Sequence, residues 1–216
     1  MFIKQETNFD FKKLGKILLH LFFPSNCPVC GKPAEIICND CIKSLFAEKI
    51  ITKQIENLDI NSASWYHTVI NQIISEFKYS GVRSLCKPIG RAMAEFFGKP
   101  ENVDYIVPVP LHLKSKRIYN QALEISKGMS EIWNIKIFDV CEWSKVMPHR
   151  AGLNAKERMK LNSDAFIVPE NIKGLKIIIV DDVCTTGLTL LRFSEAIENS
   201  GGHVICAYTL ATVSGI

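Results

Sequence analysis

An apolar segment that ends in two adjacent aspartates and then turns into a helix-like segment constrains the fold of this 216-residue chain more than any other feature. Residues 176–180 read Lys-Ile-Ile-Ile-Val, a run rich in β-branched side chains that is typical of a fully buried strand. Asp181 and Asp182 follow, and we expect a helix over residues 188–199. A buried strand followed directly by a helix is the repeating unit of a parallel α/β sheet.

Other segments extend this alternation along the chain. Apolar residues at helical spacing predict helices, and short apolar runs bounded by proline or glycine predict strands. The helices are expected over residues 65–79, 84–97 and 120–133, and the strands over residues 105–110, 135–141 and 204–210. The chain therefore predicts an α/β fold with a mostly parallel sheet and flanking helices, and a 47% hydrophobic composition is sufficient for its core.

The turn after the aspartates has the chemistry of a phosphate and sugar site. Backbone N–H groups at a helix N-terminus attract phosphate, and Gly187 permits close backbone approach. Two adjacent carboxylates at the carboxyl end of a strand can accept hydrogen bonds from neighbouring sugar hydroxyls. Further donors are the hydroxyls of Thr185, Thr186 and Thr189. The alternative is an ordinary capped turn; the glycine-rich motifs of nucleoside triphosphate and dinucleotide sites are not present in the sequence.

Four cysteines near the N-terminus have the spacing of a structural zinc site. They form two Cys-x2-Cys pairs, Cys27 with Cys30 and Cys38 with Cys41, within segments rich in turn-forming residues. Two such pairs supply four tetrahedral ligands, whereas a redox-active pair or buried free thiols are the alternatives. The other four cysteines are isolated in apolar segments, which favours a reducing compartment and hence the cytoplasm.

The N-terminal 25 residues contain a short apolar run that resembles part of a signal peptide. It is too short to span a membrane, acidic residues precede it, and no small-residue cleavage site follows. Its apolar residues have the i, i+3, i+4, i+7, i+8 spacing of an amphipathic helix, at Leu14, Ile17, Leu18, Leu21 and Phe22. We expect this helix to pack on its own domain, residues 1–50 to form a helix and zinc knuckle, and residues 51–216 to form the α/β domain.

Residues 180–189, Val-Asp-Asp-Val-Cys-Thr-Thr-Gly-Leu-Thr, resemble the fingerprint of type I phosphoribosyltransferases. The remaining motifs resemble ComF-type competence proteins in content and order, from about residue 22 to 211. They are the cysteine pairs after Phe23-Pro24, Phe77-Lys78-Tyr79-x-Gly81, Val107-Pro108-Val109-Pro110-Leu111-His112, Arg117-Ile118-Tyr119-Asn120-Gln121-Ala122 and Gly152-Leu153-x3-Glu157-Arg158.

The resemblance implies a type I phosphoribosyltransferase-like domain that binds phosphoribosyl pyrophosphate together with magnesium. The ribose and 5′-phosphate would lie against Asp181, Asp182, Val183, Cys184, Thr185, Thr186, Gly187 and Thr189. The pyrophosphate side would be formed by Lys78, Pro108, Val109, Pro110, Arg117 and Asn120. The polar residues 144–163 would be the hood that closes over the ligand, with Lys145, Arg150, Lys156, Arg158 and Lys160 neutralising the diphosphate.

Two departures from the family pattern concern the surroundings of the ligand. The family usually has glutamine near Arg150 and asparagine near Leu161, so hood hydrogen bonds would differ. Ile118 and Tyr119 replace a usual Gly-Phe pair. The acidic pair and the threonine turn are unaffected, so ligand binding is better supported than any reaction, and the sequence assigns no catalytic residue.

Three functions remain open. The first is a competence protein that binds phosphoribosyl pyrophosphate and handles incoming single-stranded DNA, with a competence helicase or another DNA-uptake protein as partner. A basic surface at Lys114, Lys116 and Arg117 would contact the DNA, with Tyr119 available to stack, although a net charge of +4 is modest for a nucleic-acid protein. The second is a transferase of nucleotide salvage, and the third is a non-catalytic ligand sensor. The three tryptophans, Trp65, Trp133 and Trp143, are expected to be packing residues, as is His112.

Overall fold

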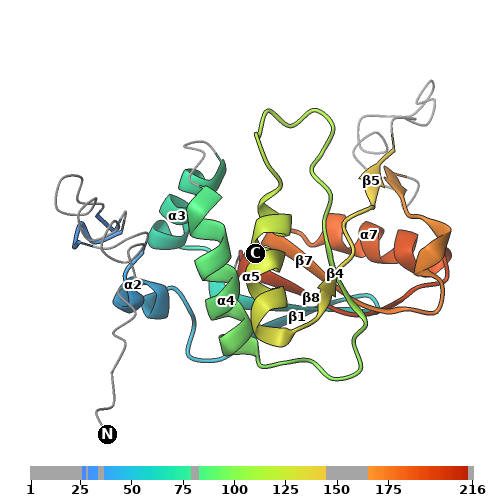
Figure 1. Cartoon of the computed structure of the whole chain (residues 1–216), viewed down its shortest axis with the longest axis horizontal. Helices are drawn as coiled ribbons and strands as arrows, with labels where there is room; N and C mark the ends of the chain where they lie inside the picture. Colours follow the sequence, from blue (N-terminus) through green and yellow to red (C-terminus); the bar gives the residue numbers. More distant parts are fainter. Residues whose placement is uncertain (1–25, 28, 34–36, 79–82, 145–164, 214–216) are drawn as a thin grey trace, which may run out of the picture.

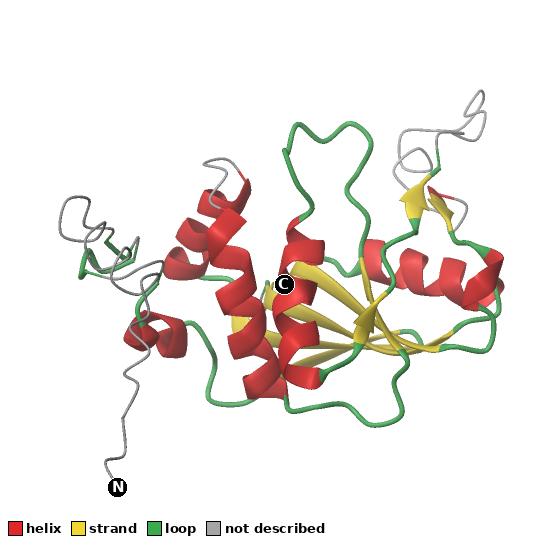
Figure 2. Ribbon diagram, in the orientation of Figure 1, coloured by secondary structure: helices red, strands yellow, loops and turns green. Residues whose placement is uncertain are grey.

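The computed structural model describes residues 26, 27, 29–33, 37–78, 83–144 and 165–213, which form a six-stranded sheet covered by helices on both faces (Figures 1 and 2). The strand order is β1-β2-β8-β7-β3-β4, and every neighbouring pair is parallel except β1 with β2. The strands are β1 (Ile51–Ile55), β2 (Leu58–Trp65), β3 (Tyr105–Pro108), β4 (Lys136–Ile137), β7 (Lys176–Cys184) and β8 (His203–Thr212). The predicted mostly parallel sheet is confirmed.

The helices lie between the strands in the alternation that the sequence predicts. They are α2 (Asn39–Ser44), α3 (Thr68–Lys78), α4 (Cys86–Phe97), α5 (Gln121–Trp133) and α7 (Leu188–Asn199), with 3-10 turns at η1 (Arg83–Leu85) and η3 (Glu170–Ile172). A separate antiparallel pair, β5 (Glu142–Trp143) and β6 (Phe166–Ile167), flanks residues 145–164. The predicted N-terminal helix and most of the predicted hood, residues 145–163, lie outside the described residues.

Strand β7 divides the interior into two hydrophobic cores because its side chains alternate between the faces of the sheet. Ile178 and Val180 pack with residues of α3, α4 and α5, whereas Ile177 and Ile179 pack with residues of α7. All four side chains are fully buried. The uninterrupted Ile-Ile-Ile-Val run is thus the signature of a strand covered on both faces.

Helices α4 and α5 cross at two glycines. A Cβ on Gly90 would lie 2.1 Å from the Ile125 carbonyl oxygen, and one on Gly128 would lie 2.2 Å from that of Lys87. Trp133, which is buried as predicted, donates its indole N–H to the Ala94 carbonyl at 2.9 Å. The two helices therefore form a close junction with no room for a larger side chain.

The four-cysteine segment is continuous with one of these cores. Cys27, Ile37, Cys41 and Leu45 are buried in the same cluster as residues of α3, α4 and the sheet. The knuckle is therefore packed on the α/β domain, and the division between residues 50 and 51 stays a prediction.

Three sequence-based predictions of element bounds are wrong. Residues 51–65 form the β1-β2 hairpin, so Trp65 is the last residue of a strand, 45% exposed, and the helix begins at Thr68. The strand expected over residues 135–141 is only β4. Strand β7 continues past residue 180 because Asp181, Val183 and Cys184 keep their pairing with β8.

Candidate functional site

The acidic pair lies on β7 rather than after it, at the carboxyl end of the sheet. The Asp182 N–H donates to Asp181 Oδ1 at 2.7 Å. The Asp182 carboxylate is only 5% exposed, and its Oδ2 lies 2.8 Å from Lys78 Nζ and 3.9 Å from Arg117 Nη1. Lys78 comes from the end of α3 and Arg117 from the loop before α5. Two distant cations predicted at this site therefore meet the same carboxylate.

Burial raises the pKa of Asp181 to about 8, and the adjacent charge of Asp182 adds to this increase. The Asp182 N–H and the positive charge of Lys78 oppose it without cancelling it. At neutral pH Asp181 therefore holds its proton for most of the time. Both carboxyls can accept hydrogen bonds from a pair of sugar hydroxyls, and a cation bound beside them would favour the ionised form of Asp181.

The turn between β7 and α7 lies next to the acidic pair, at the N-terminus of α7. Gly187 precedes the helix with φ of +74°, and the Leu188 N–H faces Thr186 Oγ1 at 3.4 Å. Thr185 and Thr186 are exposed. A Cβ on Gly187 would lie 2.1 Å from Ile55 Cδ1, so the β1-β2 hairpin supports the turn from below. Only glycine satisfies both this φ and this contact.

The opposite wall is the loop after β3. Val109 N–H donates to the Val180 carbonyl at 2.9 Å, which fixes this loop against β7. Asn120 caps α5 by accepting from Leu123 N–H at 3.4 Å and donates its side-chain amide to the Val109 carbonyl at 2.9 Å. Arg117 Nη1 donates to Gln121 Oε1 at 3.0 Å. The retained Asn-Gln pair of the motif thus positions both the loop and the arginine.

These walls enclose a pocket of about 190 Å³. Of the predicted ligand residues, those that line it are Asp181, Asp182, Thr189, Val109, Pro110, Arg117 and Asn120. Lys78 joins them through its contact with Asp182, and Pro108 is buried at the end of β3. The other predicted residues do not line it: Thr185, Thr186 and Gly187 form the adjoining turn, and Val183 and Cys184 belong to β7. Cys184 is 1% exposed and packs in the core, so its side chain is turned away from any ligand in the pocket.

Trp143 belongs to the site, although the sequence predicted a packing residue. It lines the pocket from β5, donates its indole N–H to the Pro110 carbonyl at 2.7 Å, and lies edge-on to His112 at 4.6 Å between ring centroids. His112, Ser115 and Gln121 also line the pocket and were not predicted as ligand residues. A lone tryptophan has no motif, so only the pairing of β5 with β6 reveals its place.

Tyr119 does not offer the free ring that stacking on DNA would need. Its ring packs against the core cluster, its hydroxyl lies 3.8 Å from Cys86 Sγ, and the Arg83 guanidinium lies over it at 5.9 Å from the centroid. Arg117 is likewise directed toward Asp182. Of the predicted DNA surface, Lys114 and Lys116 remain as exposed side chains on the loop.

The four N-terminal cysteines converge as their spacing predicts. A tight turn joins the first pair, with Gly31 N–H donating to the Cys27 carbonyl and Cys27 N–H to the Lys32 carbonyl, both at 2.8 Å. The second pair spans the start of α2, where Ile42 N–H donates to the Cys38 carbonyl. All four sulfur atoms lie within 4.8 Å of one another.

The sulfur geometry fits a zinc ion. The Cys30 and Cys38 sulfurs are 3.6 Å apart, close to the spacing of about 3.8 Å that a tetrahedron with Zn–S bonds of about 2.3 Å requires. Burial opposes ionisation of Cys27, but the backbone N–H groups of Cys38, Cys30 and Val29 outweigh it and lower its pKa to about 6. Burial and the neighbouring thiols raise the pKa of Cys41. Four thiolates need a cation, and zinc would supply it.

The remaining cysteines are isolated and buried, as predicted. Cys86, Cys141, Cys184 and Cys206 are all free thiols, between 0% and 8% exposed. Burial raises the pKa of each. They are packing residues with little thiolate character.

Among the described residues, no helix is long and apolar enough to cross a membrane.

The family model "Phosphoribosyl transferase domain" matches residues 109–215, and the sheet is the mostly parallel one of the type I phosphoribosyltransferase fold. The curated relatives narrow the class. The chain is 24% identical to Competence protein ComFC of Bacillus subtilis over 82% of this chain and 71% of that protein. It is 23% identical to Competence protein ComFC of Streptococcus pneumoniae, with 86% of this chain and 80% of that protein covered. It is 27% identical to Competence protein F of Haemophilus influenzae, with 86% of this chain and 83% of that protein covered. Over most of its length the chain is therefore similar to these ComF-type competence proteins.

Proposed function

We propose that the pocket binds phosphoribosyl pyrophosphate with magnesium, and that the chain uses this ligand in the handling of DNA taken up by the cell. The observation that carries the first part is the convergence of the acidic pair on β7, the turn before α7 and the Arg117-Asn120 loop at one edge of the sheet. The competence names of the relatives support the second part.

Different residues of the pocket would bind different parts of phosphoribosyl pyrophosphate. The N–H groups of the turn before α7 bind the 5′-phosphate at the positive end of the helix. Asp181 and Asp182 contact the ribose hydroxyls, while Arg117 and Lys78 attract the diphosphate. Magnesium would neutralise diphosphate charge when bound, and the acidic pair fits it only together with ligand oxygens, since Asp182 already contacts Lys78.

Calorimetric titration of the zinc-loaded chain with phosphoribosyl pyrophosphate and Mg²⁺ tests the site. We expect saturable heat for the native chain and none for Asp181→Asn/Asp182→Asn. Asp59→Asn is the control, because Asp59 is an exposed carboxylate on β2 away from the pocket. Equal binding by the double variant, or no heat for the native chain, would exclude this site.

A second candidate, transfer of the phosphoribosyl group to a planar acceptor, is favoured by one observation. His112 and Trp143 form an aromatic wall of the pocket that the ligand phosphates do not need. Release of pyrophosphate in the presence of candidate bases would establish turnover. Binding without release under any condition would favour the sensor function.

DNA contact rests on Lys114 and Lys116, exposed beside the exposed apolar residues Leu113 and Ile118 on the loop before α5. If this loop binds single strands, Lys114→Ala/Lys116→Ala should weaken binding for all sequences alike and reduce the salt dependence by about two counterions. Lys99→Ala/Lys136→Ala is the matched control, because both lysines lie at the amino ends of the strands, on the far side of the domain from this loop. No binding at low salt would contradict a direct DNA role. We propose the cytoplasm as the location of both activities.

A further inference from the structure

Helix α4 has a second face whose apolar residues the described part of the chain covers only in part. One face, which includes Ile89, Gly90 and Met93, is buried against α5 and the core. The opposite face carries the apolar residues Pro88, Ala92 and Phe96 at i, i+4 and i+8, with the charged Arg91 and Glu95 beside them. Helices of a globular domain rarely present such a stripe on two sides unless both are covered.

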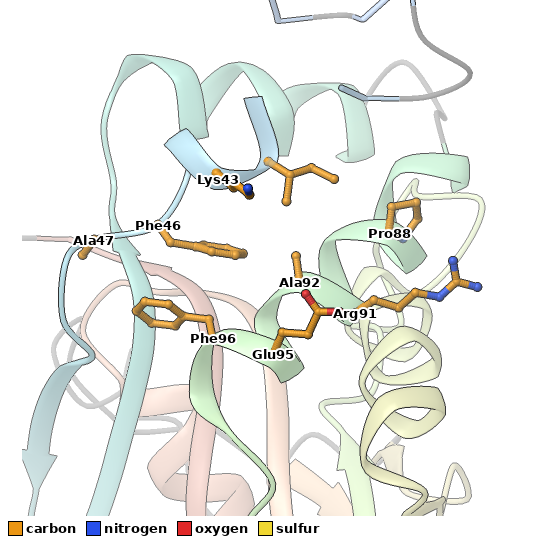
Figure 3. A pocket seen from close by; sticks show the side chains of 9 residues that line it. Lys43, Phe46, Ala47, Pro88, Arg91, Ala92, Glu95 and Phe96 are labelled. Carbon is orange, nitrogen blue, oxygen red and sulfur yellow. The ribbon is translucent and has the colours of Figure 1, made fainter. Parts of the chain in front are cut away.

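This second face forms one wall of a groove of about 710 Å³ (Figure 3). The other wall is α2 and the residues after it, with Ile42, Phe46 and Ala47. Phe46 and Phe96 face each other across the floor at 5.1 Å between ring centroids, and both are only partly buried. Lys43, Arg91 and Glu95 lie at the rim. The groove is therefore apolar along its length and charged at its edges.

We propose that the groove is the docking site of the N-terminal segment of this same chain, residues 11–23, as an amphipathic helix. The apolar side chains of this segment include Leu14, Leu18 and Phe22 at i, i+4 and i+8, the spacing of the apolar residues on this face of α4. Thirteen helical residues span about 20 Å and the twelve residues of α4 about 18 Å. The two stripes match in spacing and in length.

The chain connection places the segment at the groove. Residue 26 is where the described chain begins, and the sulfur of Cys27 lies within 4.8 Å of that of Cys41 on α2. Ile42, the next residue on α2, lines the groove. Residues 24–26, which reach about 10 Å when extended, tether the segment to the knuckle beside the groove. A tethered segment also has a high effective concentration there.

Hydrogen exchange of the zinc-loaded full chain tests the proposal. We expect amides of residues 14–22 to exchange at least tenfold more slowly than in the free peptide 1–25, at every protein concentration. Ala92→Glu, in the groove wall, and Leu18→Glu, on the apolar stripe, should each remove this protection. Lys16→Glu lies on the opposite side of the segment's helical wheel and should leave it unchanged.

Each other outcome contradicts the proposal. Unprotected residues 14–22 in the native chain would show that the groove is not their site. Protection that grows with protein concentration would assign the groove to a second copy of the chain. Protection that survives Ala92→Glu, with zinc content and melting temperature unchanged, would place the segment elsewhere. Leu18→Glu alters only the segment, so it keeps the test valid if Ala92→Glu does not fold.

Discussion

The four-cysteine knuckle and the pocket at the carboxyl ends of the strands differ in how the sequence builds them. The knuckle draws its four sulfurs from 15 consecutive residues, and local turns alone bring the members of each pair together. The pocket draws Lys78, Arg117, Trp143 and Asp182 from four separate segments, namely the end of α3, the loop before α5, β5 and β7, so it exists only when the sheet has its strand order. Spacing reveals the first kind of site, whereas topology is needed for the second.

The same comparison predicts how each region fails. A local site whose ligands require a cation should depend on that cation, and a topological site should depend on the junctions of the domain. The junction of α4 with α5 connects the two regions, since α4 lines the groove beside the knuckle and Asn120, the N-cap of α5, lines the pocket.

The largest expected effect is loss of the metal from the knuckle. Cys41→Ser should reduce bound zinc from one ion per chain to none, because structural sites bind with about 10–16 kcal/mol and three thiolates with one hydroxyl do not hold the ion as well. Phosphoribosyl pyrophosphate affinity should change less than about threefold. Metal analysis and calorimetry measure both. Cys206→Ser, at a buried thiol outside the cluster, should keep its zinc. A loss of ligand affinity that parallels zinc loss would contradict the independence of the two regions.

Crowding the junction should affect both regions together. Gly128→Ala would place a Cβ 2.2 Å from the Lys87 carbonyl oxygen, and forcing α4 and α5 apart should cost about 3 kcal/mol or more in the free energy of unfolding. Denaturant titration should show this loss, with reduced zinc retention and ligand binding. Gly174→Ala is the control: it has φ of +75° but open space at the Cβ position, so it should cost only about 1–2 kcal/mol of backbone strain. Equal losses in both variants would show that the junction is not close-packed.

Removing one partner of the buried ion pair should affect the pocket and the stability of the α/β domain, but not the knuckle. Lys78→Met leaves Asp182 with only the more distant Arg117, and the uncompensated charge should cost about 3 kcal/mol of stability at neutral pH. Affinity for the diphosphate should fall as well, while zinc content stays unchanged. Lys99→Met, at the opposite edge of the sheet, is the comparison. If the two variants unfold at the same denaturant concentration, the pair does not stabilise the fold.

The smallest effect is a proton released by the acidic pair. Because the pKa of Asp181 is raised in the folded chain, the folded state binds more protons than the unfolded state between about pH 4 and 8, and stability should fall as pH rises through that window. A ligand that brings magnesium favours the ionised pair, so binding at pH 7 should release up to about one proton. Titration in buffers of different ionisation enthalpy measures this number, and Asp181→Asn should remove it. Proton uptake on binding would contradict the assignment.

The sequence predicts the parts of this molecule that one segment specifies. The uninterrupted Ile-Ile-Ile-Val run predicts a buried strand, the apolar spacing predicts a helix from about residue 120, and the cysteine spacing predicts the four-cysteine cluster. Strand β2 was missed because it buries Ser62 and Ser64, small polar residues that interrupt the apolar pattern. The Ser62 hydroxyl is hydrogen-bonded to the Thr209 hydroxyl of β8, with 2.7 Å between the two oxygens. The two residues are 147 positions apart in the sequence.

The pocket shows the same limit. Its predicted residues came from motifs, but the sequence does not show that Arg117 and Lys78 share one carboxylate, or that Trp143 closes a wall. These contacts depend on which strands are neighbours in the sheet. Strands β3 and β7 are adjacent, although 67 residues lie between the end of β3 and the start of β7. Long-range pairing, rather than local preference, determines them.

The central claim is that a pocket at the carboxyl ends of β3 and β7 holds phosphoribosyl pyrophosphate. The most direct measurement is a crystal structure of the zinc-loaded chain with phosphoribosyl pyrophosphate and Mg²⁺. The account predicts the 5′-phosphate at the N–H groups between Thr185 and Leu188, the ribose hydroxyls at Asp181 and Asp182, and the diphosphate beside Arg117. Ligand bound elsewhere, or a pocket that stays empty at saturating ligand, would contradict it.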